Sequence, residues 1–153
     1  MNTTLSPDQP ATQTAERQQW MAVLARAAAD ALRPHCAGLP PHRRLRGPEI
    51  GLVMLRGRMG GDGAAFNLTE ATATRCTVDM AGRMGHATVL GRDMEQAELA
   101  AMLDAALQDP ALRPALLASV IAPLAAEQAE RRARDARRAE ATRVQFFTMA
   151  TMR

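Results

Sequence analysis

The chain has 153 residues, of which 47% are hydrophobic, and it carries a formal net charge of +3 at pH 7. This length predicts one domain that is large enough to bury a core. With two cysteines, no secretory signal pattern and no apolar run long enough to cross a bilayer, the sequence predicts a cytoplasmic protein with reduced thiols and no membrane association.

The composition leaves two questions open. Alanine and methionine supply much of the hydrophobic fraction, beside only 3 Phe, 1 Trp and no Tyr. Such a core is either completed by a partner or a product of GC-rich coding bias. All 19 basic residues are arginine, which indicates either recognition of anions and partner subunits or the same bias. We favour GC-rich coding bias as the explanation of the arginine excess.

The first third of the chain predicts a tail and one helix. Residues 1–14 are rich in Ser, Thr, Pro and Gln and are expected to be a flexible tail, so that residues 15–153 form the single domain. Apolar residues at three-and-four spacing predict a helix from about Ala15 to Leu32, which Pro34 should end. Trp20 on this helix is either a core residue or an anchor for a subunit interface.

Residues 35–48 are predicted to be an irregular connector. His35, Cys36 and His42 lie in it, and these are side chains that can ligate a metal. Their spacing matches no standard zinc pattern and no fourth ligand lies nearby in sequence. We therefore expect no metal site here.

The middle of the chain predicts a small antiparallel sheet. Runs of β-branched and apolar residues between glycine-rich turns predict strands over residues 49–59, 71–80 and 85–90. Helices are predicted over residues 94–108, 111–121 and, after Pro123, to about Thr142. Asp93 is expected to cap the first of them, with Gln96 completing a capping box. The fold class is therefore α+β, with about three or more strands, an N-terminal helix and a C-terminal set of helices.

Candidate binding residues lie in and beside this sheet. Three glycines within residues 60–63 form either a nest of amides for a phosphate or, more commonly, a strand turn. Two arginines precede this turn on one face of a strand, and two more follow along the sheet. The predicted contacts with an anion or a partner are Arg56, Arg58, Gly60, Gly61, Arg75 and Arg92.

The C-terminal region suggests docking surfaces. Ala125, Ala129, Ala133 and Ala136 form a narrow stripe that suits close helix packing. Arginines from Arg131 to Arg138 alternate with acids, which predicts a solvated and largely self-paired face. After the helix, the apolar ending is expected to dock on a partner or on the sheet. With Trp20, its interface candidates are Arg143, Phe146 and Phe147.

No catalytic motif is present. His86 has no evident base partner and Cys76 lies in the middle of a strand, so no nucleophilic triad is predicted. We expect no independent activity and assign no catalytic residue. The alternative class is a basic nucleic-acid-binding or general interaction module, which the pI of about 10.0 and the C-terminal arginines suggest. The absence of Lys and Tyr argues against base stacking.

Seven short segments between about Arg17 and Met149 follow the pattern of one known family. They are Gln19–Ala25, Gly51–Val53, Arg58–Gly63, Phe66–Cys76, Gly91–Asp93, Ile121–Leu124 and Arg143–Met149. In this order they resemble PhnG, a small subunit of the bacterial carbon–phosphorus lyase system. Two features depart from the family pattern: Thr88 stands where a Tyr is common, and the tail lacks the usual glycine and acidic residues.

The resemblance implies a role in phosphonate catabolism. Members of the family act with PhnI, PhnH and PhnL proteins to displace adenine from MgATP by an alkylphosphonate, which forms ribose 1-alkylphosphonate 5-triphosphate. The radical subunit PhnJ later cleaves this product after loss of pyrophosphate. Nucleosidase activity is associated with PhnI, and PhnG resembles a structural partner present in two copies. The resemblance therefore implies a homodimeric arrangement within a hetero-oligomer, no cofactor bound by this chain alone, and MgATP as a substrate of the complex.

Overall fold

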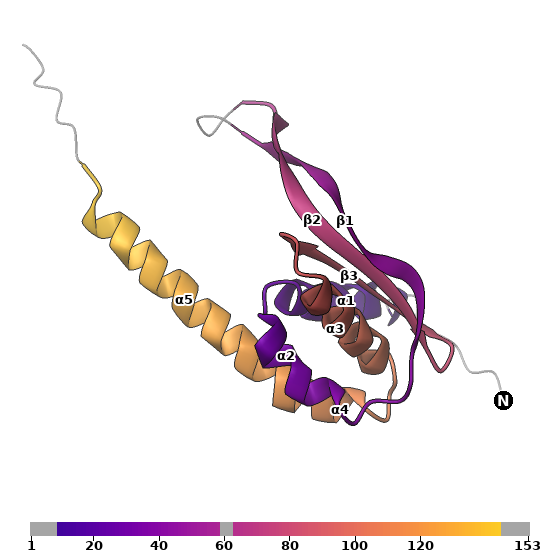
Figure 1. The fold of residues 1–153 in the computed structure, drawn as a ribbon. Coiled ribbons are helices and arrows are strands. Elements are labelled where there is room, and N and C mark those ends of the chain that lie inside the picture. The colour runs from indigo at the N-terminus through magenta and orange to yellow at the C-terminus, as the bar shows by residue number, and fades with distance from the viewer. Residues whose placement is uncertain (1–8, 59–62, 145–153) are drawn as a thin grey trace, which may run out of the picture.

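The computed structural model describes residues 9–58 and 63–144, and for residues 9–12 it describes the backbone alone. Three antiparallel strands form a sheet in the order β1-β2-β3, and helices pack on it (Figure 1). The predicted α+β class is confirmed. The elements are α1 Gln9–Leu24, α2 Ala29–Cys36, β1 Arg43–Gly57, β2 Phe66–Met80, β3 Arg83–Leu90, α3 Met94–Leu107, α4 Arg113–Leu116, η1 Leu117–Ile121 and α5 Ala122–Ala141.

The N-terminal region differs from the single helix predicted over residues 15–32. Helix α1 begins at Gln9, and the helical structure has a break after Leu24, before α2 starts at Ala29. The side chain of Gln96 stabilises this break, because its Nε2 donates to the carbonyl oxygens of Ala25 and Ala27 at 3.2 and 2.7 Å. The reciprocal half of the predicted capping box is thus replaced by a tertiary contact. Asp93 does cap α3, accepting from the Gln96 backbone N–H at 2.8 Å.

Pro34 does not end a helix as predicted but lies inside α2. A proline inside a helix removes one backbone hydrogen bond, which a short helix tolerates when its other side is well packed. Helix α2 buries Leu32 and Cys36, and it packs against α3. Tertiary packing therefore overrides the local signal.

Strand β1 begins at Arg43, inside the segment predicted to be an irregular connector. The Gly47-Pro48 pair suggests a break, but the strand continues through it with register shifts on both sides of Arg46. Gly47 has a φ of +54°, which a glycine adopts at low cost, and proline is tolerated at a bulge. Strand β2 likewise starts earlier than predicted, at Phe66.

The core lies between α3 and the paired strands β2 and β3. Thr74, Cys76 and Val78 point from β2 towards α3 and are all at most 1% exposed. On β3 the same face carries Gly85, where an added Cβ would clash with the carbonyl oxygen of Ala101. The small residues of α3 and β3 therefore let helix and sheet approach closely, which accounts for the alanine-rich composition.

The last helices follow one another without an intervening loop. Helix α4 passes through the π-helical turn η1 into α5. Pro123 stands in the first turn of α5, as predicted, and its missing N–H accounts for the widened turn before it. No residue of α5 is buried. None of the described helices is long and apolar enough to cross a membrane.

Candidate functional site

The four candidate arginines do not converge on one site. The strand register places Arg56 of β1 opposite Asn67 of β2, whereas it places Arg75 of β2 opposite Glu49 of β1. Seven residues of β1 separate these two positions, which is about 23 Å at the usual rise per residue. Arg92 follows the end of β3, and Arg58 follows the end of β1. The predicted contacts Gly60 and Gly61 lie outside the described residues, so a phosphate nest there stays a prediction.

The four side chains are exposed, and within the described residues none of them forms an ion pair with an acid. Arg56 donates through Nη2 to the carbonyl oxygen of Ala65 at 3.2 Å. Arg75 lies across Gly51, where an added Cβ would be 3.5 Å from its Nη2. This is the geometry of separate surface cations that can meet a carboxylate or phosphate of a partner. It is not that of a single anion pocket.

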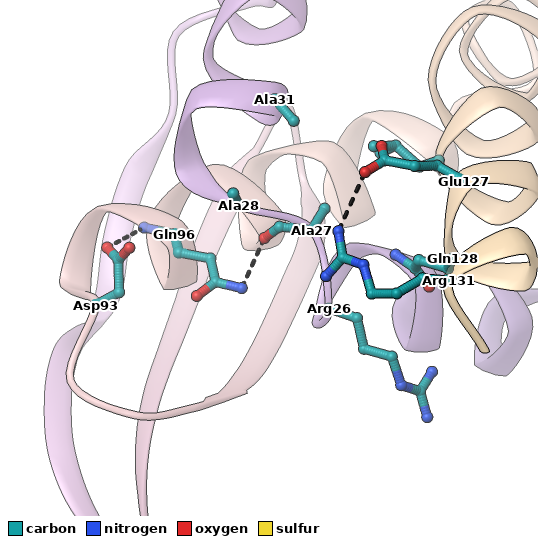
Figure 2. Close-up of a pocket in the computed structure, with 10 residues that line it drawn as sticks. Arg26, Ala27, Ala28, Ala31, Asp93, Gln96, Glu127, Gln128 and Arg131 are labelled. Carbon is teal, nitrogen blue, oxygen red and sulfur yellow. Dashed lines mark hydrogen bonds and ion pairs between the residues drawn. The ribbon is translucent and has the colours of Figure 1, made fainter. Parts of the chain in front are cut away.

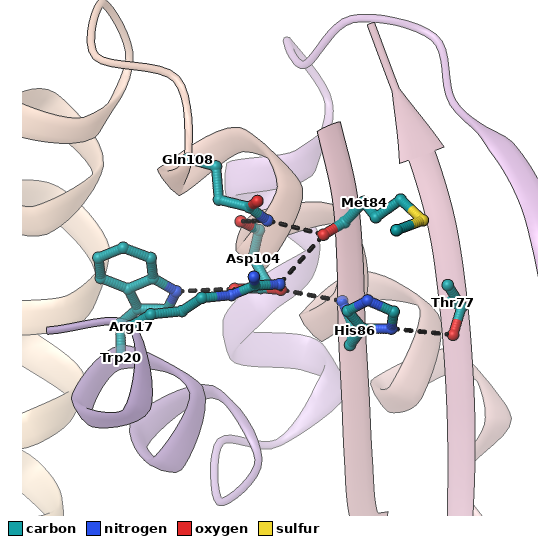
Figure 3. Close-up of polar contacts among 7 residues, drawn as sticks. All are labelled: Arg17, Trp20, Thr77, Met84, His86, Asp104 and Gln108. Atoms are coloured by element: carbon teal, nitrogen blue, oxygen red, sulfur yellow. Dashed lines mark hydrogen bonds and ion pairs between the residues drawn. The ribbon is translucent and has the colours of Figure 1, made fainter. Parts of the chain in front are cut away.

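A buried carboxylate joins α1, α3 and β3 (Figure 3). Asp104 is fully buried on α3 and accepts from Arg17 at 2.7 and 3.2 Å. The indole N–H of Trp20 donates to it at 2.8 Å and the backbone N–H of His86 at 2.9 Å. Charge pairing together with these donors compensates for the desolvation of the carboxylate. Asp104 therefore fixes the helices to the free edge of the sheet.

The same junction places Trp20 in the core. Trp20 is 4% exposed, and the guanidinium of Arg113 lies 5.6 Å from its ring centroid. Of the two roles considered for Trp20, the structure supports the core residue. Arg17 and Asp104 were missed at the sequence level. The available signal was an acid inside the Leu99, Leu103, Leu107 stripe of α3.

A second charged cluster ties the start of β1 to α3. Glu98 accepts from Arg44 at 2.6 and 2.7 Å, and its Oε1 lies 3.0 Å from Nε2 of His42. The Arg44 guanidinium and, to a lesser extent, His42 lower the pKa of Glu98. His42 is thus engaged with a carboxylate rather than arranged as a metal ligand.

The cysteines are buried and inert. Burial raises the pKa of Cys36 to about 11, and burial together with nearby Glu98 raises the pKa of Cys76. Thiols held protonated in this way are poor nucleophiles and poor metal ligands. Among the described residues, no three His, Cys, Asp or Glu side chains are grouped so that they could hold a metal.

A pocket lies where the α1–α2 linker meets α3 and α5 (Figure 2). Its polar walls are already engaged with one another. Glu127 and Arg131 form an ion pair at 3.1 Å, and Gln128 donates to the carbonyl oxygen of Val23 at 2.9 Å. Gln96 is committed to the linker. The contacts of these lining residues therefore hold the base of α5, and they leave no convergent set of free charges in the pocket.

The largest unexplained feature is an apolar surface on the β1–β2 hairpin, which we call the projecting face. Its β1 residues alternate on the side of the sheet that α3 covers further along, and no element of the described chain covers them here. Leu52 is 63% exposed and Leu68 51%. Contiguous exposed apolar surface of this kind marks interaction sites. The projecting face consists of Ile50, Leu52 and Met54, and beyond the register shift Phe66 and Leu68 are exposed on the opposite side of the hairpin.

Of the other interface candidates, Arg143 is exposed and pairs with Glu140 at 3.2 Å. Phe146 and Phe147 lie outside the described residues, so their docking on a partner stays a prediction. Sequence reasoning placed the interface at the chain ends and did not single out the projecting face. The signal was present in the run Ile50–Leu55, where both faces of an edge strand are apolar.

Comparison with known proteins identifies the family of the chain. The family model described as "Phosphonate metabolism protein PhnG" matches residues 15–151. A protein of Rhizobium meliloti (strain 1021), "Alpha-D-ribose 1-methylphosphonate 5-triphosphate synthase subunit PhnG", is 45% identical over 145 residues, which cover 88% of this chain and 88% of that protein. The chain therefore belongs to the PhnG family of phosphonate metabolism proteins.

Proposed function

We propose that this chain is an accessory, non-catalytic subunit of a carbon–phosphorus lyase core complex. In that complex it supports formation of ribose 1-alkylphosphonate 5-triphosphate from MgATP and an alkylphosphonate, with release of adenine. The relative from Rhizobium meliloti is named a subunit of the synthase for the methylphosphonate compound. Its identity to this chain and its near-complete coverage support the same role here.

The observation that carries the proposal is the projecting face. A chain that leaves Leu52 on this face and Leu68 on the other side of the hairpin more than half exposed has apolar surface available for a partner. The buried ionisable groups, by contrast, are held by structural contacts: Asp104 by Arg17, and Glu98 by Arg44. A surface without a matching catalytic cluster in the described residues fits a subunit that completes or positions another protein's active site.

The proposed partners are PhnI-like, PhnH-like, PhnJ-like and PhnL-like proteins in the cytoplasm, with two copies of this chain in the assembly. Within it, Arg56, Arg58, Arg75 and Arg92 serve as separate contacts to acidic groups of neighbouring subunits or of the nucleotide. Their separation along the sheet supports several contacts rather than one anion site. The chain itself binds no cofactor, and MgATP is a substrate of the complex.

Reconstitution tests the proposal. Adenine release from MgATP and methylphosphonate is measured with the partner subunits, first with this chain and then without it. We expect release to need this chain and the chain alone to be inactive. Adenine release by this chain alone would contradict the non-catalytic role, and an unchanged rate without it would contradict the accessory role.

A nucleic-acid-binding role has less support. The arginines of α5 are exposed, but two of them pair with acids one turn earlier, Arg131 with Glu127 and Arg134 with Glu130. Binding through phosphates would show as a steep loss of oligonucleotide affinity with added salt. We expect no such binding by the purified chain.

A further inference from the structure

Strand β3 lies at an edge of the sheet, so half of its backbone groups have no neighbouring strand to pair with. In an antiparallel pair, residues that direct their N–H and C=O groups towards the partner strand alternate with residues that direct them away. Met84 and His86 direct theirs away from β2, because they bond to side chains of α1 and α3 (Figure 3). Thr88 and Leu90 continue this alternation and therefore direct theirs away from β2 as well.

The chain closes the first part of this edge with its own side chains. The carbonyl oxygen of Met84 accepts from Arg17 at 3.1 Å and from Gln108 at 2.8 Å. The backbone N–H of His86 donates to Asp104 at 2.9 Å. These contacts take up the groups that a further strand would need, so no strand can be added at Met84.

The second part of the edge, from Thr88 to Leu90, has no such cover, and we call it the open edge. Among the described residues, the N–H groups of Thr88 and Leu90 and the carbonyl oxygen of Thr88 have no hydrogen-bond partner. The side chains of both residues are exposed. A row of unpaired N–H and C=O groups of this kind is a template for pairing with another chain.

Helix α1 stands beside the open edge and leaves a groove there. Two pockets that share Ala22, Ala25 and Thr88 make up this α1–β3 groove, and their volumes are about 230 and 410 Å³. A water molecule occupies about 30 Å³ of liquid, so the groove has room for side chains. Its walls include Met21 of α1 and Ala100 of α3, and these small and apolar residues suit apolar side chains.

The other free edge of the sheet, on β1, carries features that hinder strand addition. The register of β1 shifts on both sides of Arg46, and Pro48 lies within the strand. Bulges, prolines and charged side chains are devices that protect a strand edge from pairing. The open edge has none of them, because residues 87–90 read Ala-Thr-Val-Leu and keep a regular register with β2. The edge of β3 is therefore the better acceptor.

The chemistry of the site selects an extended occupant. A helix cannot supply main-chain hydrogen bonds to the open edge, because its own backbone groups pair within it. An extended segment directs its N–H and C=O groups sideways and its side chains alternately to the two faces of the sheet. Every second side chain then enters the α1–β3 groove, where the walls favour an apolar residue, and the others lie beside the exposed side chain of Thr88.

We propose that an extended segment of a partner subunit, with apolar side chains at alternate positions, adds to β3 at the open edge. Its main chain bonds to Thr88 and Leu90, and its apolar side chains fill the α1–β3 groove. In strand addition of this kind the main-chain bonds supply affinity and the pockets supply specificity. The inference deepens the proposed function and rests on the chain acting as a subunit of a complex.

Amide hydrogen exchange tests the main-chain contact. Exchange is measured residue by residue in the full-length chain, first alone and then in the complex reconstituted with the partner subunits. We expect the N–H groups of Thr88 and Leu90 to exchange rapidly in the lone chain and at least about tenfold more slowly in the complex. The N–H of His86, which is bonded to Asp104, is the internal reference and should be slow in both.

A pair of substitutions at one position supplies the second test. Thr88→Pro removes the N–H at the open edge, and the fold should survive because the ladder with β2 does not use this group. We expect assembly with the partner subunits to weaken at least about tenfold in Thr88→Pro and little in Thr88→Ala, which keeps the N–H. Circular dichroism checks that each variant is folded. Ala22→Phe, which fills the α1–β3 groove from α1, should weaken assembly even if Thr88→Pro does not fold.

The outcomes separate this inference from the proposed function. A complex that forms with unchanged exchange at Thr88 and Leu90, or with equal affinity for all three variants, would overturn the inference and leave the proposed function standing. Slow exchange at both residues in the concentrated lone chain would assign the open edge to a second copy and would also overturn the inference. Failure to assemble with the partner subunits would contradict both.

Discussion

Two regions of the molecule differ in how their side chains are packed. One region is helix α3 with strands β2 and β3, and the other is the hairpin end with α5. In the first, small side chains allow close packing and the buried polar groups are paired, as Asp104 is with Arg17 and Trp20. In the second, Leu52 and residues 129–141 of α5 face solvent. We expect the first region to fold without a partner and the second to be covered in an assembly. The predictions below test this division.

Removing the buried carboxylate should have the largest effect. We expect Asp104→Ala to lower the free energy of unfolding by about 3–5 kcal/mol, because it leaves Arg17 without its partner and the Trp20 and His86 donors unsatisfied. Urea unfolding measures the change. Glu70→Ala is the control, a carboxylate on the projecting face that should change stability by less than about 0.5 kcal/mol.

A matched leucine pair compares the two regions directly. Leu103→Ala, at a fully buried position, should cost about 2–5 kcal/mol of folding stability. Leu52→Ala, at a position 63% exposed, should leave the stability of the lone chain nearly unchanged and weaken its association with partners. A large loss of stability in the lone chain from Leu52→Ala would contradict the division.

A glycine pair tests the close approach of helix and sheet. Gly85→Ala should cost about 1–3 kcal/mol, because the new methyl group would meet the backbone of Ala101 and Ala105. Gly38→Ala should have a much smaller effect, since an added Cβ there has nothing within 4 Å. Thermal unfolding of both variants measures the difference. Equal effects would mean that α3 and β3 are not closely packed at Gly85.

Lowering the pH should produce the smallest of these changes in folding stability. Arg44 and His42 lower the pKa of Glu98, so its ion pairs stabilise the fold above the ordinary pKa of the carboxyl, near 4.5. This contribution is lost as the pH falls below that value and through the pKa in the folded state. Glu98→Gln should therefore lose less stability than the parent chain over that range. An identical acid profile in urea midpoints would contradict a role for this cluster.

The sequence predicts the elements whose signals are local. The leucine stripe and the Asp93 cap predict α3 closely, and the glycine-bounded apolar runs predict three antiparallel strands. The alternation along β2 also identifies Thr74, Cys76 and Val78 as one face, which the structure shows to be buried.

What could not be predicted depends on distant partners. The break between α1 and α2 is held by Gln96, about seventy residues further along the chain. Asp104 meets Arg17 and Trp20 across 87 and 84 residues, so neither contact leaves a periodic signal. The start of β1 was obscured by Gly47-Pro48, because a bulge and a break have the same local composition. The sequence suggests that the four candidate arginines form one group because they are the same residue type, whereas the strand register separates them.

The central claim is that this chain is a subunit whose open surfaces are closed by partners. The most direct test is to express it with the PhnI-like protein of the same system and to measure the mass of the purified species in solution. The account predicts a stable hetero-oligomer containing both chains, and a lone chain that self-associates or is poorly soluble. A monodisperse monomer that does not bind the PhnI-like protein would contradict it.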